Sequence, residues 1–204
     1  MLALATLAWI ALAPTTHRRT EVVAAAKADP GKIVFGSPGF GATQHLAAEL
    51  FKQVAGVNML HVPYRTTPEA ITALLSKNTD VLFDTVTALL GQVQSGQMRA
   101  LAVTSKERDP AVPDIPTATE SGVVPGYDVT TWYGLYGPKG MPKPVIAKLN
   151  KVLNEILEEP ETKARLTKTG VIVKSSTPEA WHEFMVAEYK KWSDVRVKAG
   201  LEQR

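Results

Sequence analysis

Short apolar runs rich in β-forming residues alternate with stretches of helical periodicity between residues 32 and 103. Between these runs, apolar residues recur at three- and four-residue spacing, as on one face of an amphipathic helix. Such alternation favours parallel strands joined by helical crossovers, so the pattern predicts an α/β fold. The β-rich runs cover residues 32–35, 58–62, 80–84 and 99–103.

The later part of the chain has a different pattern. An aromatic, β-rich run at 129–136 is broken by Gly-Pro-Lys-Gly at 137–140, which indicates a linker. Thr-Pro-Glu sequences predict two helix starts, one with Thr67 as N-cap and one opening the final helix at residue 177. The predicted division is an apolar segment at 1–14, an α/β lobe at 15–130, a hinge strand at 131–142 and a C-terminal helical segment at 143–204.

The apolar segment at 1–14 allows two interpretations. It has signal-peptide length and small residues near its end, but Arg18 and Arg19 follow the apolar run instead of preceding it. The run is about a dozen residues, too short to span a bilayer. We therefore expect either an apolar inter-lobe strand or a degenerate signal-like segment.

Residues 36–43, GSPGFGAT, connect a predicted strand to a predicted helix. Glycine and proline let this backbone turn sharply and leave its N–H groups uncovered, while the helix N-terminus adds unpaired donors and a positive dipole end. The stretch thus predicts an anion site, to which Ser37, Thr43 and His45 can add side-chain bonds. Its spacing matches neither G-x-G-x-x-G nor a nucleotide P-loop. The alternative is a tight turn that binds nothing.

Two further polar residues, Tyr64 and Asp84, lie where β-rich runs end. Ligands of parallel sheets sit at the carboxyl ends of strands, so we expect both residues to share a pocket with the glycine-rich stretch. Asp84 either binds a ligand ammonium or an ordered water, or caps the next helix. Tyr64 either lines the cleft or packs before a turn. His45 either contacts the ligand or bonds to backbone at the helix start.

Composition narrows the chemistry. The 204 residues carry a net charge of +3 with scattered Lys and Arg, which argues against a nucleic-acid partner. The absence of cysteine excludes disulfides, thiol nucleophiles and cysteine-ligated metals. The histidines show no HxxxH or HExxH spacing, so we expect neither a metal nor another cofactor. Ser37 lacks the glycine two residues before it that a nucleophile elbow needs, so we expect no enzyme activity.

Several motifs in fixed order resemble one protein family. They are GSPGFGATQHLAAELF from residue 36, HVPYR from 61, DVLFD from 80, RALAVTS from 99 followed by PDIPTATESG, YGLYGPKGMPKPVIAKLN from 133, and STPEAW from 176. Together they resemble the tripartite tricarboxylate transporter receptors, which are solute-binding proteins also called Bug or TctC-like. The resemblance extends from about residue 20 to the C-terminus.

This resemblance implies a type II periplasmic-binding-protein-like α/β fold, with one complete lobe of parallel sheet and a partial second lobe formed by the C-terminal helices. It implies a periplasmic receptor for a small organic carboxylate, such as a di- or tricarboxylate or an acidic amino acid. The expected partners are this ligand and the membrane permease subunits, and a complete chain is expected to be monomeric. The donors to the carboxylate would come from Ser37, Gly39, Phe40, Gly41, Ala42 and Thr43.

Family members look longer at the N-terminus, and the second carboxylate loop that they carry has no counterpart in residues 1–19. This difference leaves a truncated, non-transporting fragment or a carboxylate sensor as an alternative, in which the apolar faces of 143–158 and 178–198 lie exposed. A hydrolase built on Ser37, with His45 or His61 as base, is the third hypothesis.

Overall fold

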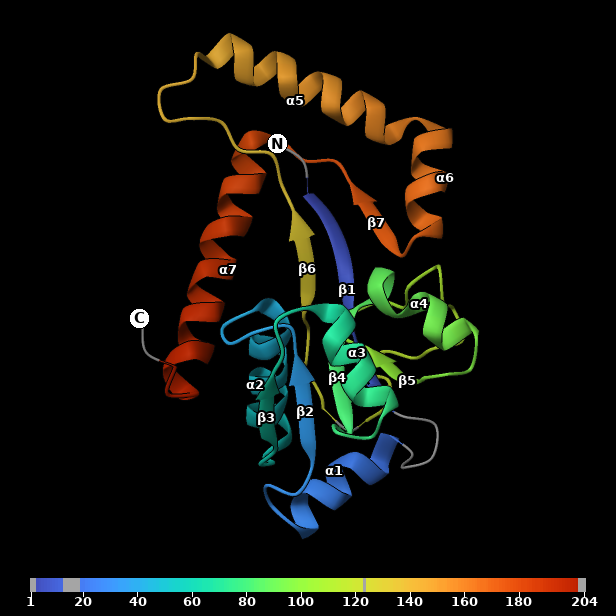
Figure 1. Cartoon of the computed structure of the whole chain (residues 1–204). Helices are drawn as coiled ribbons and strands as arrows, with labels where there is room; N and C mark the ends of the chain where they lie inside the picture. The colour runs from blue at the N-terminus through green and yellow to red at the C-terminus, as the bar shows by residue number, and fades with distance from the viewer. Residues whose placement is uncertain (1–2, 13–18, 123, 202–204) are drawn as a thin grey trace.

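The computed structural model describes residues 3–12, 19–122 and 124–201, with side chains from residue 22 onward. Two halves share one long strand, β1 (Ala3–Leu12), which runs through both of them in Figure 1. Residues 3–7 of β1 pair with β6 and β7, whereas residues 8–12 pair with β4 and β5. The two halves are therefore joined by backbone hydrogen bonds along a single strand.

The lower sheet in Figure 1 has the strand order β3-β2-β4-β1-β5. β2 is parallel to β3 and to β4, as the strand–helix alternation predicts. β1 is antiparallel to both β4 and β5, because it enters from the other half and not through a helical crossover. The other strands of this sheet are β2 (Val34–Ser37), β3 (Leu60–Pro63), β4 (Val81–Thr85) and β5 (Arg99–Val103).

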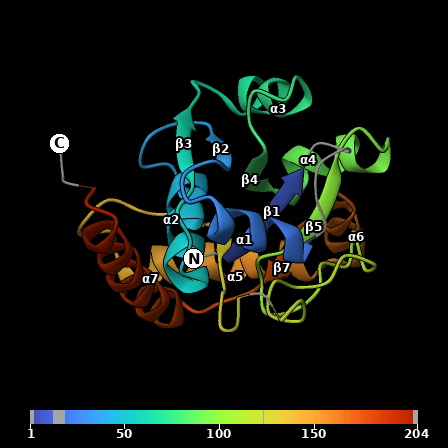
Figure 2. The same ribbon diagram turned by 90° about the horizontal axis from the view of Figure 1, so that it is seen from below.

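Helices cover both faces of the lower sheet. Figure 2 shows α3 and α4 on one side of it and α1 and α2 on the other. Side chains of β4 alternate between these two layers: Val81 and Phe83 pack in the cluster with α1 and α2, and Leu82 packs in the cluster with α3 and α4. The bounds are α1 (Arg19–Ala28), α2 (Thr43–Ala55), α3 (Thr67–Leu75) and α4 (Val86–Gln94).

Two details differ from the sequence predictions. The strands predicted from residues 32, 58 and 80 begin one or two residues later and extend one or two residues further, because ladder pairing and not apolar content sets their ends. Thr66, not Thr67, is the N-cap of α3: its Oγ1 accepts a hydrogen bond from the N–H of Glu69 at 3.3 Å. Thr67 is thereby the first helical residue, and its hydroxyl is free to bond elsewhere.

The upper half is built on the pairing of β1 with β6 and β7. Trp132 of β6 packs edge-on against Trp181 of α7 at a centroid distance of 5.3 Å. α7 also reaches the lower half, where Trp192 packs on the core and the Nε2 of Gln53 donates to the carbonyl of Val195 at 3.2 Å. The elements are β6 (Thr130–Tyr133), α5 (Lys143–Glu158), α6 (Pro160–Lys168), β7 (Val171–Lys174) and α7 (Pro178–Lys198).

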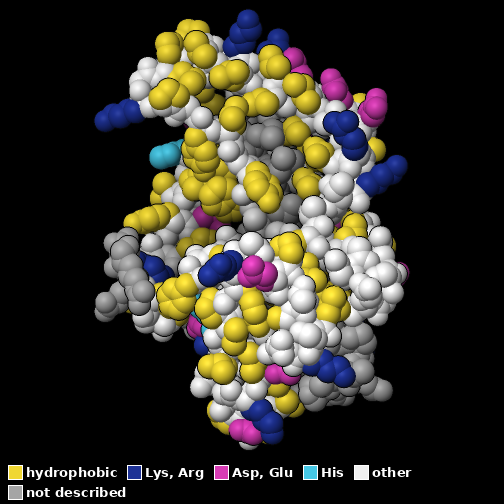
Figure 3. Space-filling model, in the orientation of Figure 1, with side chains coloured by type: hydrophobic (Ala, Val, Ile, Leu, Met, Phe, Trp, Pro, Cys, Tyr) yellow, Lys and Arg dark blue, Asp and Glu magenta, His cyan; other side chains and the backbone are white. Residues whose placement is uncertain are grey.

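The amphipathic helix α5 keeps much of its apolar face in solvent. Val145, Leu149, Val152 and Ile156 are each 42–44% exposed. Figure 3 shows hydrophobic side chains gathered over this helix. On α7, Tyr189 is 74% exposed, so its ring does not pack in the core. The division into domains stays a prediction, and positions 1, 2, 13 and 14 of the predicted apolar segment lie outside the described residues.

Candidate functional site

The glycine loop, residues 36–43, begins at the carboxyl end of β2 and leads into α2. Gly41 has a φ of +77°, a left-handed conformation that favours glycine, although a Cβ there would meet no atom within 4 Å. Ala42 is the N-cap of α2, provides no side-chain cap, and is followed by a first turn without acidic residues. The N–H donors and the positive end of the helix dipole at this terminus therefore have no capping side chain and no acidic residue beside them. Such a terminus is suited to bind an anion.

The loop uses several of its predicted donors internally. The N–H of Gly39 donates to Oγ of Ser37 at 3.3 Å, and the N–H of Gly41 donates to Nδ1 of His45 at 3.0 Å. The N–H of Ala42 donates to the carbonyl of Gly39 at 3.4 Å. Across residues 22–122 and 124–201, no hydrogen bond is made by the N–H groups of Phe40 and Thr43. These two, with the first turn of α2, are the donors left to face a ligand.

A layer of stacked rings lies beneath the loop. His45 of α2 and His61 of β3 stack face to face, with centroids 3.9 Å apart and planes 11° apart. Phe35 stacks on His61 at 4.8 Å, and Phe40, 66% exposed at the loop tip, lies 4.8 Å from His45. Burial is the main cause that lowers the pKa of both histidines, that of His61 to about 4. Both imidazoles are neutral at pH 7.

Ser37 lies within reach of a base, since its Oγ is 2.7 Å from Nε2 of His61. A hydrolase could use such a serine–histidine pair as nucleophile and base. Ser37 is nevertheless fully buried, and its hydroxyl already donates to the carbonyl of Gly39 at 3.0 Å. In this arrangement Oγ is enclosed, and its hydrogen bonds support the turn of the loop.

Asp84 ties the ends of three elements together. Its Oδ1 accepts hydrogen bonds from Nε2 of Gln44 at 3.0 Å and from the N–H of Thr85 at 2.8 Å, while its Oδ2 accepts one from Oγ1 of Thr67 at 3.0 Å. Burial raises the pKa of this carboxyl, and the three hydrogen bonds act in the opposite direction. The alternative interpretation of Asp84 as a helix cap is wrong, because Thr85 is the N-cap of α4 and bonds to the N–H of Ala88.

Tyr64 follows β3 next to the loop. Its N–H donates to the carbonyl of Ser37 at 2.8 Å, which extends the β2–β3 pairing by one bond. Its ring is half-buried and passes 3.3 Å from the position that a Cβ on Gly36 would occupy. The close approach of the ring thus favours glycine at position 36, and Tyr64 borders the loop on the β3 side.

A small cavity of about 160 Å³ adjoins the end of the glycine loop. Thr43 and Leu46 of α2 form one wall, and the hinge strand β6 forms the other. The cavity therefore lies between the lower half and the strand that leads to the upper half, where a two-lobed receptor holds its ligand. Its lining residues are Thr43, Leu46, Thr130, Thr131, Trp132 and Trp192.

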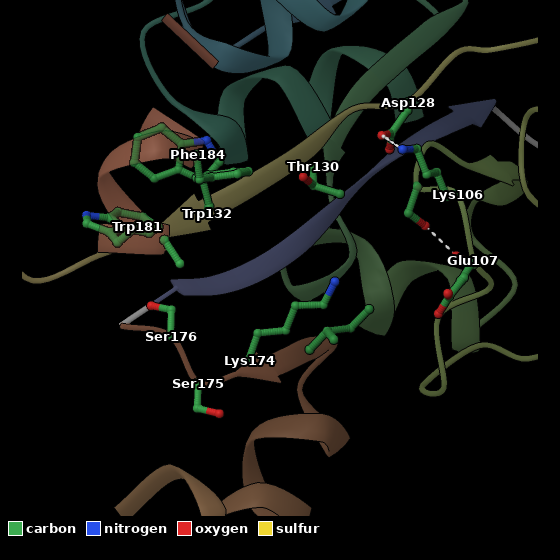
Figure 4. Close-up of a pocket in the computed structure, with 13 residues that line it drawn as sticks. Lys106, Glu107, Asp128, Thr130, Trp132, Lys174, Ser175, Ser176, Trp181 and Phe184 are labelled. Atoms are coloured by element: carbon green, nitrogen blue, oxygen red, sulfur yellow. Dashed lines mark hydrogen bonds and ion pairs between the residues drawn. The ribbon is translucent and has the colours of Figure 1, made fainter. Parts of the chain in front are cut away.

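A larger cavity of about 400 Å³ lies on the other side of Thr130 and Trp132. Figure 4 shows Lys106 and Asp128, paired at 3.6 Å, at one end and the aromatic rings of Trp132, Trp181 and Phe184 at the other. Trp132 borders both cavities, a position that its place in an aromatic β-rich run did not reveal.

The nine predicted site residues are all brought to one edge of the lower sheet, at the ends of β2, β3 and β4 or the start of α2. Ser37, His45 and Asp84 are buried there and Phe40 is exposed, so they differ in access to a ligand. Two partners of Asp84 were not predicted, Gln44 and Thr67, whereas His61 contacts Ser37 as the third hypothesis allowed. The only sequence signal for them was their place beside strand ends and helix starts.

This arrangement, in which two halves share β1 and the glycine loop lies beside β6, is typical of solute-binding proteins of the periplasmic-binding type. The chain belongs to the Tripartite tricarboxylate transporter family receptor group, whose pattern matches residues 4–201. The solved structure of periplasmic binding protein BugD is similar to it, with a TM-score of 0.83 and 34% identity over 100% of this chain and 69% of that one. The predicted family and fold class are confirmed.

Two other proteins illustrate the similarity. R. palustris Rpa4515 with adipate superposes with a TM-score of 0.88 and 25% identity, over 98% of this chain and 67% of that chain. The UPF0065 protein in the tcbD-tcbE intergenic region of Pseudomonas sp. (strain P51) is 35% identical over 182 residues, which are 89% of this chain and 54% of that relative. The chain thus spans about half the length of this curated relative.

The family and its structural neighbours are solute-binding proteins, not enzymes. Within residues 3–12, 19–122 and 124–201, no helix has the length and apolar character needed to cross a membrane.

Proposed function

We propose that this chain contributes the carboxylate-binding loop of a periplasmic receptor, which delivers a small di- or tricarboxylate or an acidic amino acid to the permease of a tripartite tricarboxylate transporter. The observation that carries the proposal is the uncapped N-terminus of α2, where the N–H groups of Phe40 and Thr43 stay unbonded among the described residues. The adipate in the R. palustris relative supports a carboxylate as the ligand class.

The mechanism is binding and closure, without chemistry. A carboxylate at the loop receives hydrogen bonds from Phe40, Thr43 and the first turn of α2, and the helix dipole favours its negative charge. The cavity beside Thr43 extends toward Thr131 and Trp132 of β6, so the body of the acid lies against the hinge strand. A ligand that contacts both halves stabilises their closed arrangement, which is the state a permease would recognise.

The test is thermal unfolding of the 204-residue chain with a panel of acids that includes adipate, citrate and aspartate. An acid at about a hundred times its dissociation constant adds roughly 2.7 kcal/mol of stability. For a chain of this size, that increment raises the melting temperature by about 5–10 °C. We expect one or two acids to produce this shift. A cooperative transition that no acid moves would contradict the proposal.

Two glycine variants show whether the shift comes from the loop. Gly41 and Gly96 both have left-handed φ angles, of +77° and +73°, and a Cβ at either would meet no atom within 4 Å. Gly41→Val and Gly96→Val therefore introduce similar backbone strain, one in the loop and one after α4. Only Gly41→Val is expected to abolish the acid-dependent shift, and equal loss in both variants would argue against the loop as the site.

A further inference from the structure

The stacked histidines, called here the histidine pair (His45 and His61), hold the glycine loop from below. His45 accepts the N–H of Gly41 through Nδ1, and His61 contacts the hydroxyl of Ser37 through Nε2. One imidazole thus fixes the middle of the loop and the other fixes its beginning. Because the rings stack at 3.9 Å, a movement of either one shifts the other.

The bond to Gly41 defines the protonation state of His45. A backbone N–H can donate to Nδ1 only if that nitrogen carries a lone pair, so the proton of the neutral ring is on Nε2. This nitrogen faces Oε1 of Glu49 at 3.7 Å. A second proton on His45 must therefore go to Nδ1, where it would face the hydrogen of Gly41 and break the bond.

His61 adds to the sensitivity of this arrangement. The hydroxyl of Ser37 donates to the carbonyl of Gly39, so Nε2 of His61 donates to Ser37 and its Nδ1 is free to take a proton. A cation formed there would lie directly over the ring of His45 and disfavour a second charge. The pair resists protonation at neutral pH, and its first proton changes the electrostatics of both rings.

Few charged groups face the pair. On α2, Glu49 lies beside His45, but its Oε1 also pairs with Nζ of Lys52 at 2.8 Å. From β2 and the loop, the groups that face the pair are the apolar rings of Phe35 and Phe40. The described residues thus place one shared carboxylate against two imidazoles, which is too little to hold both as cations.

We propose that His45 and His61 are positioning residues that keep the glycine loop in its carboxylate-binding shape only while both rings are neutral, so that acidification releases the ligand. Gly41 lies between Phe40 and Thr43, whose N–H groups have no hydrogen-bond partner in the described part of the chain, so loss of its bond to His45 misaligns both donors. The inference rests on the proposed function, in that the loop is taken as the carboxylate site.

The first experiment needs neither a variant nor a ligand. The ¹⁵N-labelled chain is titrated from pH 7.5 to pH 4, following the amides of Gly41 and Leu101 together with the imidazole nitrogens. Leu101, buried in β5, reports on global unfolding. The expected result is that the Gly41 amide shifts with the His45 titration and its protection from exchange falls at least tenfold, while Leu101 stays protected. The inference is overturned if the shift and the exchange protection of the Gly41 amide do not change as His45 titrates.

Two substitutions provide the matched controls. His45→Asn keeps an acceptor near the position of Nδ1 and does not titrate, so the Gly41 amide should become independent of pH. His61→Gln keeps the donor to Ser37 and cannot take a proton, so the Gly41 amide should still titrate together with His45. The inference is overturned if Gly41 titrates unchanged in His45→Asn. Retained protection of Leu101 shows that each variant is folded.

Adipate binding by calorimetry separates the two proposals. Between pH 7.5 and pH 4.5, adipate affinity is expected to fall at least threefold more in the wild type than in His45→Asn, because the protonation of adipate itself weakens binding equally to both proteins. If Gly41 titrates but none of the acids binds at either pH, the proposed function fails and the positioning role of the histidine pair stands. If the wild type and His45→Asn lose the same affinity although the Gly41 bond of the wild type is lost, the coupling to ligand release is refuted.

Discussion

The hydroxyl of Thr67 donates to Oδ2 of Asp84 at 3.0 Å and so links the first residue of α3 to the carboxyl end of β4. The other oxygen of Asp84 holds Gln44 in the first turn of α2. One buried carboxylate thus sets the positions of two helix N-termini relative to the sheet. Because the glycine loop leads into α2, this network supports the candidate site from the side opposite to the histidine pair.

Replacing Asp84 should show this role in stability. Asp84→Ala leaves three half-buried donors without their acceptor and should lower the free energy of unfolding by about 2 kcal/mol. Asp84→Asn should cost only about 1 kcal/mol, since its oxygen can still accept from Gln44 and Thr85 and the hydroxyl of Thr67 can accept from its amide. Urea unfolding measures both values.

The exposed Asp114 provides the control for these variants. Asp114→Ala should change the free energy of unfolding by less than about 0.5 kcal/mol. Equal effects of Asp84→Ala and Asp114→Ala would show that the Asp84 network does not stabilise the fold.

Proline at position 43 tests the backbone donor directly. Thr43 is the first residue of α2, where proline is well tolerated, and Ala42 before it has the extended φ and ψ of −62° and 158° that proline requires. Thr43→Pro should therefore change stability by less than about 1 kcal/mol while removing one N–H donor. We expect carboxylate affinity to fall about tenfold, equivalent to roughly 1.4 kcal/mol, by calorimetry.

Thr43→Val distinguishes the N–H from the hydroxyl at the same position. It keeps the backbone donor, so it should bind more tightly than Thr43→Pro. Unchanged affinity in Thr43→Pro would rule out the N–H of residue 43 as a ligand donor.

Stability should decrease on acidification because of the buried imidazoles. Burial, followed by the charges of His45 and Lys52, lowers the pKa of His61 from 6.5 to about 4, so the unfolded chain binds this proton more readily. The contribution of His61 is complete above pH 6.5 and is lost as the pH falls toward 4. Allowing for solvent screening, the loss is on the order of 1–2 kcal/mol.

Buried carboxyls act with the opposite sign. Burial raises the pKa of Asp84 and of Asp109, so their protonation favours the folded state and partly offsets the loss at acidic pH. The quantity to measure is therefore the difference between wild type and His61→Gln in urea unfolding at pH 7 and pH 4.5. Between pH 7 and pH 4.5, the wild type should lose more free energy of unfolding than His61→Gln does. Substitution of the exposed His182 by glutamine should leave the pH dependence unchanged.

Two neighbouring glycines should respond unequally to alanine. A Cβ on Gly134 would lie 2.1 Å from Cζ2 of Trp181, a fully buried ring that cannot move aside. Gly134→Ala should therefore cost about 2–3 kcal/mol. A Cβ on Gly137 would meet Cε of Met141 at 2.5 Å, but that flexible side-chain end can turn away, so Gly137→Ala should cost less than about 1 kcal/mol. Thermal unfolding with equal costs at both sites would contradict this packing.

Local features of the sequence determined the elements of this protein. Residues 99–103 and 143–158 were predicted with the bounds that the structure shows, because their apolar periodicity is strong and their ends carry clear turn or cap residues. Gly56 ends α2 in the left-handed conformation, which glycine adopts more readily than other residues. The glycine loop followed from the same local chemistry.

Contacts between distant residues decided the rest. The antiparallel position of β1 depends on its pairing with four strands from later in the chain. Ser37 meets His61 across 24 residues and Gln44 meets Asp84 across 40, so no local pattern could show which loop donors are engaged and which face a ligand. The sequence by itself thus determined the strand–loop–helix stretch on which the proposed anion site rests. Only the tertiary structure decided that the N–H groups of Phe40 and Thr43 have no partner among the described residues, because those of Gly39 and Gly41 are engaged by the side chains of Ser37 and His45.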